Sequence, residues 1–157
     1  MRWLISTLYL VFAMGLTTAQ ADDRMAIAVE GAYLLIHDND FQRVLSFTRG
    51  GTVSEVGSGE QHNSYTSGLG SWQQTGPNQV VATIVDFNFD RDSGAPTGTA
   101  RTVYTLTFEG LEQGKFQRFS GRSSGEQFAF GQNPFDPSEP PIRAFGQGFT
   151  GQRIPAQ

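Results

Sequence analysis

Two stretches, Gln79–Asp90 (QVVATIVDFNFD) and Thr99–Phe108 (TARTVYTLTF), carry the clearest periodicity in the chain. Side chains alternate between the two faces of a β-strand, and apolar residues recur at every second position in both stretches. The segment between them, RDSGAPTG, contains the Gly and Pro residues that are typical of a loop. The two stretches therefore predict an antiparallel β-hairpin.

A register with Asp90 opposite Thr99 brings the apolar side chains of both strands onto one face. In this register Val85 lies opposite Tyr104, and a slip of one residue would separate the two apolar sets. A second hairpin, predicted from Arg43–Thr48 and Thr52–Gly57, places Leu45 and Phe47 on a shared face. The predicted interior therefore carries Leu45, Phe47, Val81, Val85, Phe87, Phe89, Tyr104, Leu106 and Phe108.

The whole chain contains about nine strand-like segments at spacings near 10 to 12 residues, and no amphipathic helix longer than two turns. This pattern predicts an all-β, antiparallel fold of about eight to nine strands. Glycines are frequent and favour a curved sheet that forms a closed or nearly closed barrel. The segments are Ile27–His37, Arg43–Thr48, Thr52–Gly57, Gly68–Thr75, Gln79–Asp90, Thr99–Phe108, Lys115–Arg122, Glu126–Gly131 and Ile142–Ile154.

The amino terminus has the pattern of a secretory signal peptide. A single Arg2 precedes an apolar run from Trp3 to Leu16, and small residues end in Ala19-Gln20-Ala21. The apolar run is shorter than the ~20 residues of a membrane-spanning helix. We therefore expect residues 1–21 to be a signal peptide and residues 22–157 to be one barrel domain, without a membrane span after cleavage.

Composition narrows the class of protein further. Without Arg2, 10 basic residues face 15 acidic ones, which argues against nucleic acid as a partner. The chain has no Cys and no Asn-x-Ser/Thr site, so neither disulfides nor glycans mark a eukaryotic secretory route. These features favour a bacterial protein of the periplasm or the extracellular space. We expect a monomer or a weak dimer.

A series of short motifs runs from Leu45 to Phe108: F-x-R-G-G-T-V, G-x-G-S-W, T-G-P-N-x-V-x-A-T, D-F-N-F-D and G-T-x-R-x-x-Y-T-L-T-F. Their order resembles small exported bacterial proteins of unassigned function that look like lipocalin or calycin barrels. In lipocalins, G-x-W on the first strand places a Trp at the closed end of the barrel. Here Gly31-Ala32-Tyr33 stands at that place, with Tyr instead of Trp. Barrels of the allene-oxide-cyclase or dirigent type are the neighbouring possibility.

The predicted interior face has two interpretations. It forms either a cavity for one small apolar ligand, with the Tyr104 hydroxyl as a polar contact, or an ordinary packed core. A ligand-binding barrel without assigned catalysis is the leading hypothesis. An isomerase or cyclase, in which interior acids act on a substrate, is the first alternative. An envelope protein-interaction module, docking through a sheet edge or through the loop NPFDPSEPP, is the second.

Polar clusters give no strong evidence for a cofactor or a metal, and we expect neither. His37, Asp38 and Asp40 lie at a strand end, and Glu60 and His62 lie in a polar loop, but their spacing is not that of a zinc site. The stretch N-F-D-R-D lacks the Gly and the Glu of a calcium-binding loop. A polar set that could serve acid–base chemistry, or simply form a solvated ladder, comprises Asp86, Asn88, Asp90 and Arg101.

Overall fold

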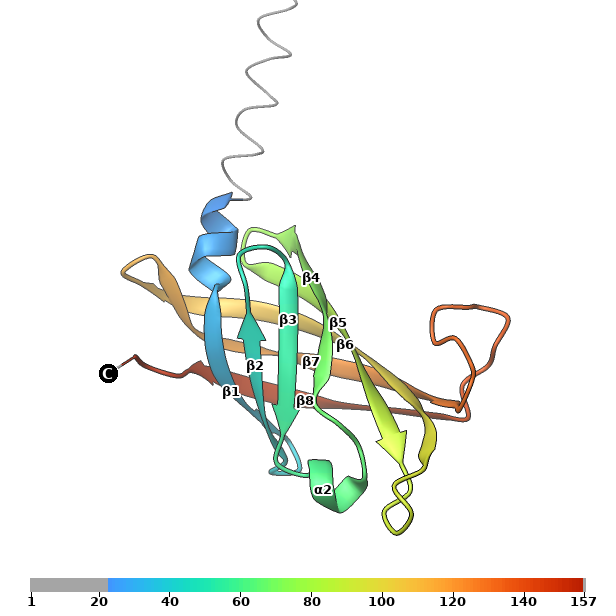
Figure 1. Ribbon diagram of the computed structural model, residues 1–157. Helices are drawn as coiled ribbons and strands as arrows, with labels where there is room; N and C mark the ends of the chain where they lie inside the picture. Colours follow the sequence, from blue (N-terminus) through green and yellow to red (C-terminus); the bar gives the residue numbers. More distant parts are fainter. Residues whose placement is uncertain (1–22, 157) are drawn as a thin grey trace, which may run out of the picture.

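The computed structural model describes residues 23–156 and shows eight antiparallel strands that form a closed barrel (Figure 1). Each strand pairs with the next along the chain, and the last strand pairs with the first. The strands are β1 (Gly31–His37), β2 (Gln42–Phe47), β3 (Thr52–Gly57), β4 (Gly68–Gly76), β5 (Gln79–Phe89), β6 (Pro96–Glu112), β7 (Lys115–Ala129) and β8 (Arg143–Arg153). The predicted signal peptide falls outside the described residues.

Several turns lie where the sequence predicts them. The Gly-rich segment after Phe47 turns the chain between β2 and β3, and Gly51 has a φ of 85°, a left-handed conformation that glycine adopts without strain. Pro77 and Asn78 connect β4 to β5. The segment predicted at Ile142–Ile154 becomes β8, which pairs with both β7 and β1 and closes the barrel.

One end of the barrel, the closed end, is covered by a helix formed by residues 23–29 (blue in Figure 1). Its side chains Met25, Ala28 and Val29 join the hydrophobic core. Tyr33 lies fully buried at this end, and the Arg153 guanidinium lies 4.6 Å from the centre of its ring. Arg153 also donates hydrogen bonds to the backbone oxygens of Ala28, Glu30 and Phe116, so one side chain joins the helix to β7.

The helix corrects the predicted start of the first strand. Ile27 to Val29 are helical, and β1 begins at Gly31, whose φ of 141° turns the chain from the helix into the strand. A β-carbon there would also collide with the Arg153 guanidinium. The two strands predicted at Lys115–Arg122 and Glu126–Gly131 are one continuous strand, β7, because Ser123 and Ser124 pair with β6 and β8 instead of forming a turn.

Aromatic side chains fill the barrel behind the closed end. Phe108 is fully buried and lies 5.4 to 5.9 Å from the rings of Tyr33, Phe47, Phe116 and Phe119, measured between ring centres. Most of these pairs meet edge to face, the arrangement that ring quadrupoles favour. This half of the interior is therefore a packed core.

The predicted register of the β5–β6 hairpin is wrong. Val85 lies opposite Arg101, and Tyr104 lies opposite Ala82. The observed pairing is shifted by three residues from the predicted one. Because three is an odd number, the opposite face of β5 points inward, with Val80, Ala82, Ile84 and Asp86. The first half of β5 is apolar on both faces, and a register shift between Asn88 and Phe89 next to a long loop sets the pairing, so alternation alone could not fix the face.

Truncation to Ala should be costly on the inner face of this hairpin and nearly neutral on its outer face. Phe108→Ala removes a ring from the packed core and should lower the free energy of unfolding by about 3–5 kcal/mol. Phe87 is 61% exposed on the outer face, so Phe87→Ala should change it by less than about 0.5 kcal/mol. Urea unfolding of both variants would measure this, and a larger loss for Phe87→Ala would contradict the observed register.

Candidate functional site

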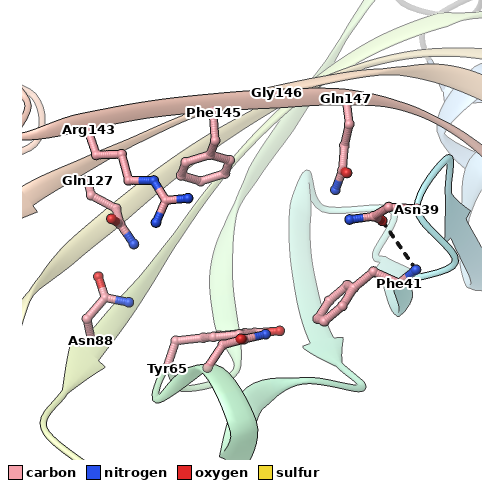
Figure 2. A pocket seen from close by; sticks show the side chains of 10 residues that line it. Asn39, Phe41, Tyr65, Asn88, Gln127, Arg143, Phe145, Gly146 and Gln147 are labelled. Carbon is pink, nitrogen blue, oxygen red and sulfur yellow. Dashed lines mark hydrogen bonds between the residues drawn. The ribbon is translucent and has the colours of Figure 1, made fainter.

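A cavity of about 430 Å³, the mouth pocket, opens at the end of the barrel opposite the helix (Figure 2). Its residues come from the β1–β2 turn, from the segment around helix α2 (Glu60–Asn63), and from β5, β7 and β8. Closure of the barrel brings these distant segments together. The lining residues are Asn39, Phe41, Asn63, Tyr65, Asn88, Gln127, Arg143, Phe145, Gly146 and Gln147.

The lining combines amides with aromatic rings. Five Asn and Gln side chains supply both hydrogen-bond donors and acceptors, while Phe41, Tyr65 and Phe145 supply apolar surface. Figure 2 shows these three rings around the same space. Arg143 is the only charged residue of the lining, and no carboxylate of the described residues lies within ion-pair distance of it. Such a lining can orient a small molecule by hydrogen bonds and stacking.

Arg43 lies beneath two of the pocket residues. Its guanidinium carbon is 5.1 Å from the ring centre of Phe41 and 5.6 Å from that of Tyr65. It forms an ion pair with Glu55, whose side chain is 3% exposed, and Tyr104 donates a hydrogen bond to the same carboxylate. The Arg43 charge is therefore neutralised inside the barrel by a satisfied partner.

His37 completes this buried group. Arg43 Nε donates a hydrogen bond to His37 Nε2 over 3.2 Å, which requires an unprotonated Nε2. Burial, with Arg43 next to it, lowers the pKa of His37 to about 4. The imidazole is therefore neutral at physiological pH, and burial raises the pKa of the Tyr104 hydroxyl to about 12, which keeps it neutral as well.

Asp86 is the one acid of β5 that points into the barrel, and it is 6% exposed. Its carboxylate forms no hydrogen bond or ion pair with another described residue, and its oxygens are not among the fully buried atoms without a partner. Burial raises the pKa of Asp86 to about 6, while the positive charge of Arg43 opposes the rise and the negative charge of Glu60 adds to it. Asp86 is therefore a charged group at neutral pH that the fold stabilises poorly.

Tyr65 supplies a second polar group without a partner. Its hydroxyl oxygen is buried close to the Arg43 guanidinium, but no hydrogen bond of good geometry from a described residue reaches it. A backbone bridge pairs Tyr65 with Asn88, two residues beyond Asp86 on the inward face of β5. Asp86 is not one of the lining residues; it lies two residues further into the barrel than Asn88, and we call the region that holds it and the Tyr65 hydroxyl the floor of the mouth pocket.

Of the nine residues that are predicted to line a cavity, five point into the barrel and four lie on its outer face. Leu45, Phe47, Tyr104, Leu106 and Phe108 point inward, but they belong to the packed interior and none lines the mouth pocket. The other four were placed on the wrong face: β5 carries Val81, Val85, Phe87 and Phe89 on its outer side.

The four residues of the predicted acid–base set do not lie together in the structure. Asp86 is buried inside and Asn88 lines the mouth pocket, whereas Asp90 accepts hydrogen bonds from Ser93 in the exposed loop. Arg101 lies on the outer face, paired with Glu126. Within residues 23–156, no group of three or more His, Cys, Asp and Glu could hold a metal ion.

Sequence reasoning missed most of the mouth pocket. Asn39, Phe41 and Asn63 lie in a turn or a short helix, and Arg143 to Gln147 lie in a Gly-rich strand without strong alternation. Arg43 and Glu55 were also missed, although opposite charges on the inward faces of two neighbouring apolar strands are a signal that could have found them. In the described part of the chain, no helix has the length and hydropathy to cross a membrane.

Comparison of the chain with protein-family models, with curated proteins and with solved structures finds no match.

Asp86→Asn should stabilise the protein at alkaline pH. The pKa of Asp86 is about 6 in the folded state, above its ordinary value of 3.8, so the ionised carboxylate opposes folding above pH 6 and has no such effect below pH 4. We expect the variant to gain about 3 kcal/mol over the wild type at pH 8 and to lose most of this advantage by pH 4. Urea unfolding at both pH values measures the difference, and His37 titrates equally in both proteins. A variant less stable than the wild type at pH 8 would contradict this assignment.

Glu55→Gln should be strongly destabilising, because it leaves the Arg43 guanidinium unpaired inside the barrel. The expected loss in the free energy of unfolding is about 3 kcal/mol. Glu126→Gln is the matched control, since it breaks the partly exposed pair with Arg101 and should cost less than about 1 kcal/mol. Equal losses in thermal or urea unfolding would show that the Arg43–Glu55 pair has no special role.

Proposed function

We propose that this chain is a small-molecule-binding barrel whose ligand occupies the mouth pocket. The observation that carries the proposal is the convergence of amide and aromatic side chains from five separate segments on one cavity of about 430 Å³. This volume lies within the range of cavities that bind small ligands. The rest of the proposal, a protein exported to the periplasm or beyond and acting as a monomer or weak dimer, rests on the sequence.

The pocket favours a different ligand from the one predicted by the sequence. A mainly apolar molecule would leave the amides of the lining without partners, which costs binding free energy. A molecule with an aromatic body and several hydrogen-bonding groups fits the lining better. The lipocalin-like character of the barrel remains part of the proposal, supported by the sequential strand order and by Tyr33 at the closed end.

An isomerase or cyclase is the second candidate function. The observation in its favour is Asp86, a buried carboxylate whose pKa is raised to about 6 beneath the pocket, because general bases work best with a pKa near the working pH. A binding barrel would leave its bound molecule unchanged, whereas an isomerase would convert it. Mass spectrometry and chromatography of the released ligand separate the two.

Native mass spectrometry of the protein purified from its own source tests the binding proposal. We expect an excess mass that is lost on denaturation. Adding the released compound back to stripped protein should shift the amide NMR signals of Asn39, Tyr65 and Phe145 more than those of the packed core around Phe108. A bare mass, together with no signal shifts in a screen of small aromatic compounds, would overturn the proposal.

Two substitutions on β8 provide a matched pair for this test. Gln147 lines the mouth pocket, whereas Gln152 is exposed on the same strand and does not line it. Loss of one hydrogen bond by Gln147→Ala should weaken binding about fivefold, as measured by titration calorimetry. Gln152→Ala should leave the affinity unchanged, and equal effects of the two would place the ligand elsewhere.

A further inference from the structure

Two polar groups on the floor of the mouth pocket have no partner in the described part of the protein. The Tyr65 hydroxyl is buried without a hydrogen bond, and the Asp86 carboxylate is 6% exposed without a donor. Buried polar groups are nearly always satisfied in folded proteins, so an unpaired hydroxyl beside a nearly buried, unpaired carboxylate favours a ligand that pairs with both. A water molecule would satisfy the hydroxyl, but it would not neutralise the carboxylate.

Tyr65 lines the mouth pocket, and Asp86 lies next to the cavity without lining it. Asn88 and Tyr65 line the pocket and are joined by a backbone bridge. Asp86 lies on the same face of β5 as Asn88, and successive side chains on one face of a strand lie about 7 Å apart. A molecule that reaches one pair of residues further into the barrel than Asn88 would therefore approach Asp86.

The charges around Asp86 leave the floor negative. Arg43 is positive but is paired with Glu55, and both His37 and Tyr104 are neutral. Glu60, on α2, adds a further negative charge and accepts hydrogen bonds from Gly57 N and Ser67 Oγ. Arg143 is positive and lines the pocket (Figure 2), but it is exposed, so water screens its charge. The inner end of the pocket thus favours a cation over an anion.

The walls suit a cation as well. Phe145, together with the faces of Phe41 and Tyr65 that Arg43 does not cover, surrounds the cavity (Figure 2), and aromatic faces attract ammonium groups. Resting on the function proposed above, we propose that the ligand is a small primary amine with an aromatic body, whose ammonium group binds Asp86 and the Tyr65 hydroxyl. The ring of the ligand packs against the aromatic walls, and the amides at the rim bind its remaining polar groups.

Three compounds with similar skeletons test the amine class: 2-phenylethylamine, 2-phenylethanol and 3-phenylpropionate. Titration of the full-length protein at pH 8, followed by calorimetry or NMR, should show the amine binding at least tenfold more tightly than the alcohol and the acid. The affinity for the amine should fall about tenfold between pH 8 and pH 5, because only about a tenth of Asp86 is ionised at pH 5 when its pKa is about 6. The amine itself stays protonated over this range.

Asp86→Asn isolates the proposed contact. It should weaken binding of 2-phenylethylamine at least tenfold at pH 8 while leaving binding of 2-phenylethanol unchanged, and it should abolish the pH dependence. Asp92→Asn, in the exposed β5–β6 loop, makes the same change in charge and should have no effect. Tyr65→Phe, which removes only the hydroxyl, should weaken amine binding severalfold without loss of stability.

The outcomes separate this inference from the proposed function. Equal affinity for the three compounds, or preferred binding of the acid, would overturn the amine class while leaving a small-molecule site in the mouth pocket. Undiminished amine binding by Asp86→Asn would overturn the role of Asp86. Absence of binding by all three compounds at millimolar concentration would also overturn the amine class, while the native mass measurement still decides whether the pocket holds another molecule.

Discussion

Pairing of β8 with both β7 and β1 is the constraint on which the rest of the structure depends. A sheet with two free edges would expose unpaired backbone groups on both outer strands, and only closure removes both edges at once. Closure also turns the inward faces of all eight strands toward one another. The aromatic core and the mouth pocket exist only because strands from the two ends of the described chain meet.

The interior has two parts with different physical character. Behind the helix, aromatic rings pack mostly edge to face, and the Tyr33 hydroxyl and Arg153 form hydrogen bonds at the edge of this core. Toward the mouth, the Arg43–Glu55 pair, held by Tyr104 and His37, marks the change to a polar environment. The pair places the Arg43 guanidinium near Asp86 and the Tyr65 hydroxyl, but Arg43 forms its ion pair with Glu55 and not with Asp86. The fold thereby retains one poorly stabilised charge at the place where a ligand would meet it.

The sequence was informative where a residue's environment depends on its neighbours along the chain. Alternation predicted an all-β fold, Gly and Pro located the turns after Phe47 and Gly76, and the frequent glycines indicated a curved sheet. The sequence was misleading where the position of a side chain depends on residues that are distant along the chain. Val80, Ala82 and Ile84 are as apolar as Val81 and Val85, and the register with β6 determines which set points into the barrel. The mouth pocket was missed for the same reason, because its amides carry no periodicity and converge only through closure. Asp86 was identified as a polar residue of interest, but its inward direction follows from a register that alternation did not fix.

Arg153 has a consequence for how the chain reaches this structure. Its side chain lies on Tyr33, 120 positions earlier in the sequence, and it binds the backbone of the helix that precedes β1. During synthesis, β1 and the helix emerge first and have no partner on that side until the last strand is complete. Contacts of such long sequence separation slow folding, because the entropy of closing the intervening chain must be lost before the contact forms. The barrel is therefore completed only after nearly all of the described chain has been made, and until then the nascent chain remains open.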